Sequence, residues 1–338
     1  MQDLLLQTVL EKLPETLHTL NIEPITIGQS GSRVYRLRPK NAQAVVLKIT
    51  EPQVMPEYLT AGYPHIADTE YNFYTQLAPR LGLPCPKLIE YGRLAGKASF
   101  LVLEDVTLNS YIPPEGHMWS TAEMISIVTT YAQMHGRAQR LFSQHGVPTW
   151  LNPDPRLIYS AEKTEGYLRA LAQNSWTKDT ASPIVLSAGL KQLLLELQNS
   201  LRNLPPTLLY NDFYPPNVAL SKAGGSAVLF DYQLISSGPH HIDISNIGFL
   251  RSDKTFCQVD GEAVLAHYLH ILSRQAGEVT SPLMFLSDYR HANLLAWADY
   301  LPRFVRAMHR SNAKNEHWGQ WMDDMFAKCM QVWARELS

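Results

Sequence analysis

Two neighbouring stretches decide the fold: Leu208-Leu-Tyr-Asn-Asp-Phe-Tyr-Pro-Pro-Asn-Val-Ala-Leu220 and Ala227-Val-Leu-Phe-Asp-Tyr-Gln233. They contain Asp212, Asn217 and Asp231, and each of these residues lies next to an apolar run of strand length. Asn217 is five positions after Asp212, and Asp231 is fourteen positions after Asn217. The pattern predicts short strands joined by loops, with the three polar side chains on the loops.

These residue types match the needs of phosphoryl transfer from a nucleotide. In that chemistry one carboxylate accepts the proton of the attacking hydroxyl, while an asparagine and a second carboxylate hold magnesium ions that bridge the phosphates. Asp212 is therefore the candidate catalytic base, and Asn217 and Asp231 are the candidate metal ligands. The Asp-x-x-x-x-Asn spacing is common by chance, but a second Asp after an apolar run at this distance makes the pattern moderately specific.

Size and composition indicate a soluble globular protein. The 338 residues suffice for two lobes with separate cores, and 45% of them are hydrophobic. The net charge of −2 and the absence of a dense Lys/Arg run disfavour nucleic acid or an anionic membrane as a partner. No apolar run is long enough to cross a bilayer, and the N-terminus lacks the pattern of a signal peptide.

The cysteine pattern favours a reducing compartment. Cys85, Cys257 and Cys329 are far apart and odd in number, which disfavours a disulfide framework or a zinc site. We therefore expect a cytoplasmic protein.

The first third of the chain has the pattern of short strands, and the remainder has the pattern of longer helices. Before residue 104 we expect helices at 3–20 and 69–81. We expect strands at 24–27 and 33–37 around a glycine-rich turn, a third strand at 44–49, and a hairpin of 87–91 and 99–103. Residues 51–64 are expected to form a loop. Beyond it we expect helices at 121–142, 160–172 and 187–201, the short strands around Asp212 and Asp231, and helices again from Asp243. This order predicts an α+β fold with two lobes, 1–104 and 105–338, and a ligand site between them.

Lys48 and Glu70 are the candidate groups on the other side of the phosphates. Lys48 lies in the aliphatic strand Val45-Val-Leu-Lys-Ile49, and Glu70 opens the following helix. A strand lysine more often extends to water, so the functional interpretation depends on Glu70 and the downstream triplet.

Backbone groups complete the predicted nucleotide site. Gly28-Gln-Ser-Gly-Ser32 can turn Ser30, Gly31 and Ser32 over the phosphates, although it lacks full G-x-G-x-x-G spacing and a plain hairpin turn is the alternative. In the connector Phe100-Leu-Val-Leu-Glu-Asp-Val106, we expect Leu103, Glu104 and Val106 to contact an adenine edge. The alternative is a strand that simply leads into a helix.

For the histidines we expect packing roles in place of catalysis or metal binding. His135 on the long helix is more often a packing residue than a catalyst. His240-His241 suits no strong zinc pattern, and Asp243 is expected to cap a helix or to fix the catalytic loop.

In this order the motifs resemble the aminoglycoside phosphotransferase and choline kinase-like superfamily, the small-molecule branch of the protein-kinase-like fold. The resemblance covers about residues 24–250 and implies Mg-ATP as donor and a small-molecule hydroxyl as acceptor. It implies that Asp212 is the base, that Asn217 and Asp231 bind magnesium, and that Lys48 with Glu70 positions the phosphates. It rests on Gly28 to Ser32, Lys48, Glu70 in EYNFYTQL, FLVLEDV, YAQMHGRA, YNDFYPPN, FDYQ and GPHHIDIS.

The chain departs from the family pattern in the catalytic loop. Tyr210 stands where the family usually has His, a position that mainly shapes the loop, and Asn211 is similar to the choline-kinase branch. Tyr-Gln after Asp231 resembles the sterol- and choline-kinase-like branches, whereas LEDV resembles the LEDL of ecdysteroid kinase-like proteins. These features resemble different branches of the family, so the sequence does not identify the phosphate acceptor.

Aromatic residues near the C-terminus are candidates for an acceptor wall, with a packed core as the stronger alternative: Trp297, Tyr300, Trp318, Trp321 and Trp333. Three functions remain. The chain is an active small-molecule kinase that works as a monomer or homodimer, a catalytically inactive nucleotide-binding protein, or a protein kinase. The third is disfavoured because Asp-Phe-Gly and Ala-Pro-Glu are absent.

Overall fold

The computed structural model contains two compact units that do not follow chain order. The first unit comprises Met1–Asn152, Tyr210–Ser236 and Gly248–Val279, and the second comprises Pro153–Leu209, Ser237–Ile247 and Thr280–Ser338. The predicted boundary at residue 104 lies inside the first unit and stays a prediction. The structure describes residues 4–17, 19–25, 32–40, 43–55, 63, 65–94, 98–158, 161–178, 190–222, 224–250, 259–278, 280–298, 300–316 and 319–337.

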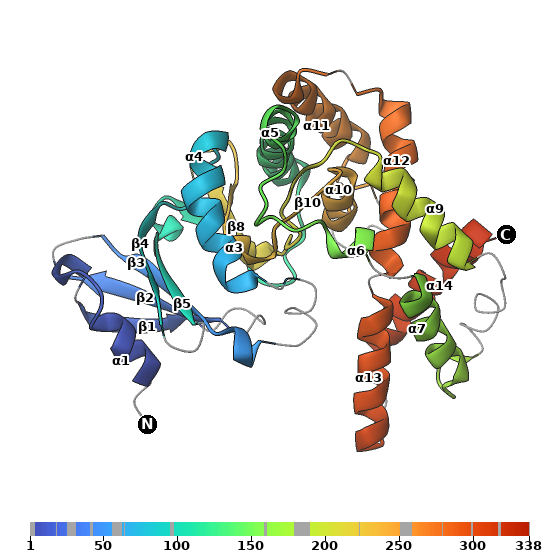
Figure 1. Ribbon diagram of the computed structural model, residues 1–338, viewed down its shortest axis with the longest axis horizontal. Coiled ribbons are helices and arrows are strands. Elements are labelled where there is room, and N and C mark those ends of the chain that lie inside the picture. The colour runs from blue at the N-terminus through green and yellow to red at the C-terminus, as the bar shows by residue number, and fades with distance from the viewer. Residues whose placement is uncertain are drawn as a thin grey trace. The chain divides into compact units, whose positions relative to one another are not determined.

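A five-stranded antiparallel sheet forms the N-terminal part of the first unit, as the strand pattern predicted (Figure 1). Its order in space is β1-β2-β3-β5-β4. The strands are β1 (Thr19–Ile25), β2 (Arg33–Pro39), β3 (Val45–Thr50), β4 (Leu88–Arg93) and β5 (Ser99–Glu104).

The side chains of β3 point alternately to the two faces of the sheet. Leu47 and Ile49 join a buried cluster with Phe100 and Val102 of β5, and the helix α1 (Leu4–Leu10) covers that cluster. Because successive strand residues point to opposite faces, Lys48 points to the other side of the sheet. One face of the sheet therefore packs against α1, and Lys48 projects from the other face.

The N-terminal helix is shorter than predicted. A helix was expected over 3–20, but α1 ends at Leu10, a 3₁₀ turn follows at Glu15–Leu17, and Leu20 belongs to β1. Pro14 explains the difference, because it lacks an N–H and disfavours a helical conformation for the residue before it. The apolar spacing was nevertheless informative, since Leu13 and Leu17 still pack into the cluster below the sheet.

The second predicted helix starts earlier than expected and is interrupted. It comprises α3 (Ile66–Asn72), a π-helical turn (Phe73–Leu77) and α4 (Ala78–Leu81). Glu70, expected to open this helix, therefore lies inside it. The widened turn is of the kind that often occurs at functional sites.

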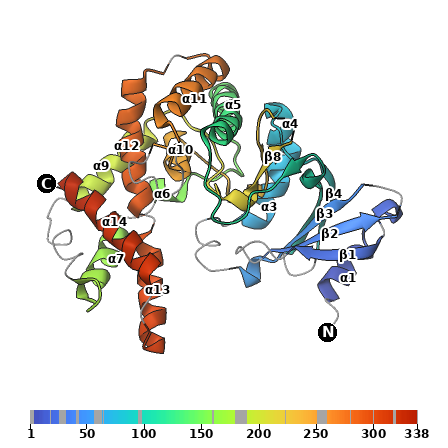
Figure 2. The same cartoon turned by 180° about the vertical axis from the view of Figure 1, so that it is seen from behind.

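Helices and short strands complete the first unit. The helix α5 (Thr121–His145) lies along α11 (Gly261–Ala276), and both views show them side by side (Figures 1 and 2). A small antiparallel sheet contains β6 (Ser110–Tyr111), β8 (Val218–Ser221) and β9 (Val228–Leu229), which flank the predicted catalytic segments.

The second unit is mainly helical. It contains α6 (Pro155–Ile158), α7 (Ala161–Gln173), α9 (Leu190–Arg202), α10 (His241–Ile247), α12 (Pro282–Ala298), α13 (Leu301–Lys314) and α14 (Gln320–Leu337), while β7 (Thr207–Leu209) pairs with β10 (Ser236–Gly238). Its core buries Trp297 and Trp333 among aliphatic side chains, so the packing interpretation of these residues is confirmed. Trp318 lies outside the described residues. The expected α+β fold, with a small antiparallel sheet followed by a mainly helical region, is confirmed.

Among the described residues, no helix combines the length and the apolar content that a bilayer crossing requires.

Candidate active site

Lys48 makes two ion pairs, both inside the first unit. Its Nζ lies 2.7 Å from Oε2 of Glu70 on α3 and 2.5 Å from Oδ1 of Asp231, which follows β9. The Lys48 and Glu70 side chains are almost completely buried, whereas 23% of the Asp231 side chain is exposed. Three residues that are far apart in the sequence and were singled out from it are therefore in direct contact.

Burial and charge act in opposite directions on the pKa values of this cluster. Burial disfavours the Lys48 ammonium, but Asp231 and Glu70 together outweigh it and raise the pKa of Lys48 above its usual value. Burial raises the pKa of the Glu70 carboxyl, with Lys48 opposing that change. Lys48 is therefore a fixed positive charge at neutral pH.

Glu70 also fixes the segment that follows Asp231. Its Oε1 accepts a 3.2 Å hydrogen bond from the backbone N–H of Tyr232. The Tyr232 ring stacks on Phe73 of the π-helical turn, with 3.7 Å between ring centroids. α3 thus holds both the lysine and the backbone of the Asp231 loop.

Asp212 and Asn217 form the second linked pair. Asn217 donates from Nδ2 to Oδ2 of Asp212 at 2.9 Å and to its backbone carbonyl at 3.2 Å. Asn211, directly before Asp212, has a positive φ of 65° and donates from Nδ2 to the carbonyl of Leu234 and to Ser236 Oγ. The loop that carries Asp212 is therefore fixed from its own far end and from the segment after Asp231.

Tyr210 connects the loop of Asp212 with the loop of Asp231. Its hydroxyl donates to the carbonyl of Phe230 and, at 3.4 Å, to the carbonyl of Asn217. The N–H of Phe230 donates to the same Asn217 carbonyl at 3.2 Å. The residue that departs from the family pattern thus bridges the loop of Asp212 and the loop of Asp231.

The donor set around Asp231 suits a hard divalent cation such as Mg²⁺. A carboxylate of Asp231 and the amide oxygen of Asn217 are oxygen ligands of the kind that Mg²⁺ prefers. Since Nδ2 of Asn217 is directed to Asp212, its Oδ1 is the atom left for a cation. Within the described residues, no group of three or more His, Cys, Asp or Glu side chains is placed to hold a metal.

The connector after β5 is fixed by side chains. Asp105 accepts hydrogen bonds from Thr107 N and from Arg36 Nε of β2, at 3.1 and 2.6 Å. Glu104 N–H donates to the Lys87 carbonyl at 2.9 Å. Leu103 belongs to β5, and Val106 begins a 3₁₀ turn directly after the sheet.

The predicted phosphate-covering loop is described at Ser32 alone; Ser30 and Gly31 lie outside the described residues. The hydroxyl of Ser32 lies 3.3 Å from Thr50 Oγ1 at the end of β3 and 3.4 Å from Oε1 of the buried Gln233. This places Ser32 near the segments of Lys48 and Asp231.

Sequence reasoning missed the aromatic surroundings of Asp212. Phe213 packs against Trp119, with 5.7 Å between ring centroids, and Tyr214 donates a hydrogen bond to Glu115. Burial and that hydrogen bond raise the pKa of Tyr214 to about 12. The adjacency of Phe213 and Tyr214 to Asp212 was a usable signal, whereas nothing in the sequence pointed to Trp119.

The other polar residues singled out from the sequence are buried. His135 is completely buried, and its Nδ1 lies 2.8 Å from the hydroxyl of Tyr268. His240 and His241 are buried and stack on each other at 4.2 Å. Asp243 is buried at the third position of α10, inside the helix rather than at its N-cap, and belongs to the second unit.

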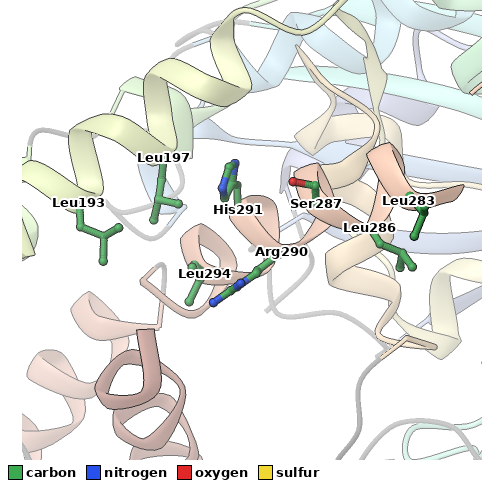
Figure 3. Close-up of a pocket in the computed structure, with 8 residues that line it drawn as sticks. All are labelled: Leu193, Leu197, Leu283, Leu286, Ser287, Arg290, His291 and Leu294. Atoms are coloured by element: carbon green, nitrogen blue, oxygen red, sulfur yellow. The ribbon is translucent and has the colours of Figure 1, made fainter. Parts of the chain in front are cut away.

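A separate pocket of about 560 Å³ lies between α9 and α12 of the second unit (Figure 3). Leucines line it, with Ser287, Arg290 and His291 as its polar members. It contains no predicted site residue, and no described feature indicates what occupies it, so we assign it no role.

Comparison with known proteins identifies a family and similar folds. The model of the phosphotransferase enzyme family (APH) matches residues 21–286. No curated protein sequence matches the chain significantly.

Solved structures of small-molecule kinases have the same fold. A choline kinase from Cryptosporidium parvum Iowa II is 11% identical, with a TM-score of 0.62, over 100% of this chain and 96% of that one. The amicoumacin kinase hAmiN in complex with AMP-PNP, Ca²⁺ and Ami is 15% identical, with a TM-score of 0.61, over 97% and 93%. Macrolide 2'-phosphotransferase MphH from Brachybacterium faecium is 15% identical, with a TM-score of 0.52, over 98% of both chains.

Proposed function

Because the chain belongs to the phosphotransferase enzyme family, we propose that it transfers the terminal phosphoryl group of ATP to a hydroxyl of a small molecule. One observation carries the proposal: a single compact unit contains Lys48 paired with Glu70 and Asp231, and Asp212 paired with Asn217. Positioning and charge stabilisation by such groups account for most of the catalysis in nucleotide phosphoryl transfer.

Asp212 acts as the base. Its carboxylate accepts the proton of the acceptor hydroxyl while that oxygen forms a bond to the terminal phosphorus. The bond from this phosphorus to the bridging oxygen breaks, and ADP leaves with the electron pair. Asn217 holds the Asp212 carboxylate through its 2.9 Å hydrogen bond, which fixes the direction of the accepting oxygen.

Lys48 and Glu70 act on the donor side. Glu70 is anchored by Tyr232 N–H and holds Lys48 Nζ, so the ammonium is directed before a nucleotide arrives. Asn217 and Asp231 would bind magnesium, which supplies neutralisation of the phosphate charge. We propose that the backbone of Leu103, Glu104 and Val106 would contact the adenine edge, and that Ser30, Gly31 and Ser32 would cover the phosphates.

Asp212→Asn separates chemistry from binding. The amide keeps the size of the side chain and an oxygen for Asn217 but cannot accept the proton, so turnover should fall by at least about 100-fold. Phosphate transfer is followed as ADP release with a panel of alcohols, amino alcohols and aminoglycosides, in wild type and variant. Undiminished turnover in Asp212→Asn would remove Asp212 from its role.

Nucleotide binding is tested by thermal stability. A ligand that binds only the folded state raises the melting temperature by mass action. Mg-ATP should raise the melting temperature of wild type and Asp212→Asn alike, and ATP with a chelator should raise it less. No shift with any nucleotide would overturn the proposal. A magnesium-dependent shift without transfer to any acceptor would favour the alternative, a catalytically inactive nucleotide-binding protein.

The acceptor, the choice between monomer and homodimer, and the cytoplasmic location stay predictions. Cys85 and Cys329 are free thiols, and among the described residues no disulfide occurs.

A further inference from the structure

Asp231 adopts a backbone conformation that needs support. Its φ of 65° and ψ of 64° lie in the left-handed region, which residues other than glycine rarely occupy. Such strained residues persist where the surrounding structure fixes them. The conformation directs the carboxylate that the proposed function assigns to a cation.

The peptide units on both sides of Asp231 are held by side chains. The unit after Asp231 contributes the N–H of Tyr232, which donates to Oε1 of Glu70 at 3.2 Å. The unit before it contributes the carbonyl of Phe230, which accepts from the hydroxyl of Tyr210. Because φ and ψ of Asp231 are the rotations between these two units, fixing both fixes the direction of the side chain.

The Tyr210 ring is immobilised, so its hydroxyl has a defined place. The side chain is completely buried. Its ring meets Tyr131 edge to face at 6.0 Å and Tyr232 at 5.3 Å. Replacement by phenylalanine therefore removes the hydrogen bond and leaves the packing in place.

We propose that Tyr210 is a positioning residue whose hydroxyl holds the peptide unit before Asp231 and thereby sets the affinity of the site for its divalent cation. The inference rests on the proposed function, since it assigns the cation to Asp231 and Asn217. It predicts a specific division of effects: Tyr210 governs the metal dependence of nucleotide binding and leaves metal-free nucleotide binding unchanged.

Tyr74 provides a matched control. It is buried, lies on the same π-helical turn as Phe73, and meets Tyr232 edge to face at 5.9 Å. Its hydroxyl has no hydrogen-bond partner among the described residues. Tyr74→Phe thus removes a hydroxyl from the same aromatic cluster without removing a hydrogen bond to the loop of Asp231.

The first experiment titrates Mg²⁺ at a fixed concentration of AMP-PNP and follows the melting temperature of wild type, Tyr210→Phe and Tyr74→Phe. For Tyr210→Phe the half-effective Mg²⁺ concentration should rise about tenfold, as expected when one buried hydrogen bond is lost. For Tyr74→Phe it should match wild type. AMP-PNP with a chelator should stabilise all three proteins equally.

A second measurement needs no ligand. Amide hydrogen exchange in a peptide that contains Phe230 to Tyr232 should be several-fold faster in Tyr210→Phe than in wild type or Tyr74→Phe. Equal exchange in all three proteins would show that the hydroxyl does not hold this segment, and it would overturn the inference even for a variant too unstable for titration.

The outcomes separate the two proposals. A wild-type protein that binds AMP-PNP without any response to Mg²⁺ overturns the proposed metal site and, with it, the role of Tyr210. A wild-type response together with an unchanged half-effective concentration in Tyr210→Phe overturns only the role of Tyr210. An equal loss in Tyr74→Phe would mean that general packing, and not this hydroxyl, is responsible.

Discussion

Arg36 Nε donates a 2.6 Å hydrogen bond to Oδ2 of Asp105, which joins β2 to the connector after β5. The other oxygen of Asp105 accepts from the N–H and the hydroxyl of Thr107. Although burial opposes the charge, the hydrogen bonds from Thr107 and Arg36 hold the pKa of Asp105 below its usual value. The connector is therefore held by an ionised, mostly buried carboxylate, and its backbone is fixed before a nucleotide binds.

Asp105→Asn should weaken nucleotide binding. The change removes the charge that holds Arg36 and Thr107, so the backbone of Glu104 and Val106 loses its fixed direction. We expect affinity for AMP-PNP to fall by about 1 kcal/mol, roughly fivefold, with little change in turnover at saturating nucleotide. Isothermal titration and steady-state kinetics measure the two quantities.

Glu23→Gln is the control for this prediction. Arg36 Nη1 also lies 3.9 Å from Glu23, whose side chain is 42% exposed. This longer, solvated ion pair should contribute little. If Glu23→Gln weakens nucleotide binding as much as Asp105→Asn, the net charge near Arg36 matters and the connector geometry does not.

Gly136→Ala should destabilise the first unit because α5 and α11 approach each other there. A Cβ at Gly136 would lie 2.5 Å from Gln275 Cβ and 2.9 Å from the backbone N of Ala276. The helices must separate to admit it, at a cost of about 1–3 kcal/mol. Gly166→Ala on α7 is the matched control, since no atom of the described residues lies within 4 Å of its added Cβ. It should stabilise by about 0.5–1 kcal/mol. Denaturant unfolding measures both, and the same sign for both would contradict the packing argument.

Local pattern predicted the parts of the site that depend on local geometry. The aliphatic run at 44–49 predicted a strand that carries Lys48, and this strand is present as β3. Lys48 points away from Leu47 and Ile49 because side-chain direction in a strand follows from position. The five-residue spacing brought Asp212 and Asn217 into contact within one loop. Pro14 was visible in the sequence, yet apolar periodicity outweighed it and the first helix was predicted too long.

Contacts between distant segments could not be predicted in the same way. The hydroxyl of Tyr210 donates to the carbonyl of Phe230, twenty positions away, and no spacing pattern in the sequence encodes that contact. Trp119 reaches Phe213 across nearly a hundred positions, and no periodicity encodes that distance. The sequence named the chemical groups, whereas the packing of the fold determines which neighbours hold them.

The stability contribution of Glu123 should depend on pH. Burial opposes its charge, but hydrogen bonds from Tyr111, Ser120 and His117 lower the pKa of Glu123 to about 2. An unfolded glutamate has a pKa of about 4.3. Because the folded value is lower, the contribution is present above pH 4.3 and is lost as pH falls toward 2.

Glu123→Gln tests this dependence. Glu123 completes a capping box with Ser120 at the start of α5, and glutamine can also make that box. At pH 7 the variant should still be less stable by about 1 kcal/mol, because a neutral amide accepts the hydrogen bonds from Tyr111, Ser120 and His117 more weakly than a carboxylate does. Urea unfolding at intervals from pH 7 to pH 2.5 measures the difference between variant and wild type. That difference should shrink below pH 4.3, and a constant difference would show that the charge of Glu123 is not responsible.

The ion pair between Asp154 and Arg156 should stabilise the second unit only as a pair. Asp154 is completely buried and accepts from Arg156 Nε at 2.8 Å and Nη2 at 2.9 Å, while Arg156 Nη1 donates to Asn246 at 2.8 Å. Asp154→Ala leaves a buried guanidinium without this carboxylate and should cost about 3–5 kcal/mol. The double variant Asp154→Ala/Arg156→Met should be more stable than Asp154→Ala alone, because the uncompensated charge is gone.

Glu165→Ala, which breaks the more exposed i,i+4 pair with Arg169, is the control and should cost about 0.5 kcal/mol or less. Unfolding free energies of wild type, Asp154→Ala, Arg156→Met, the double variant and Glu165→Ala test this prediction. If the effects of the two core substitutions simply add, Asp154 and Arg156 contribute independently and the charge pairing has no net effect.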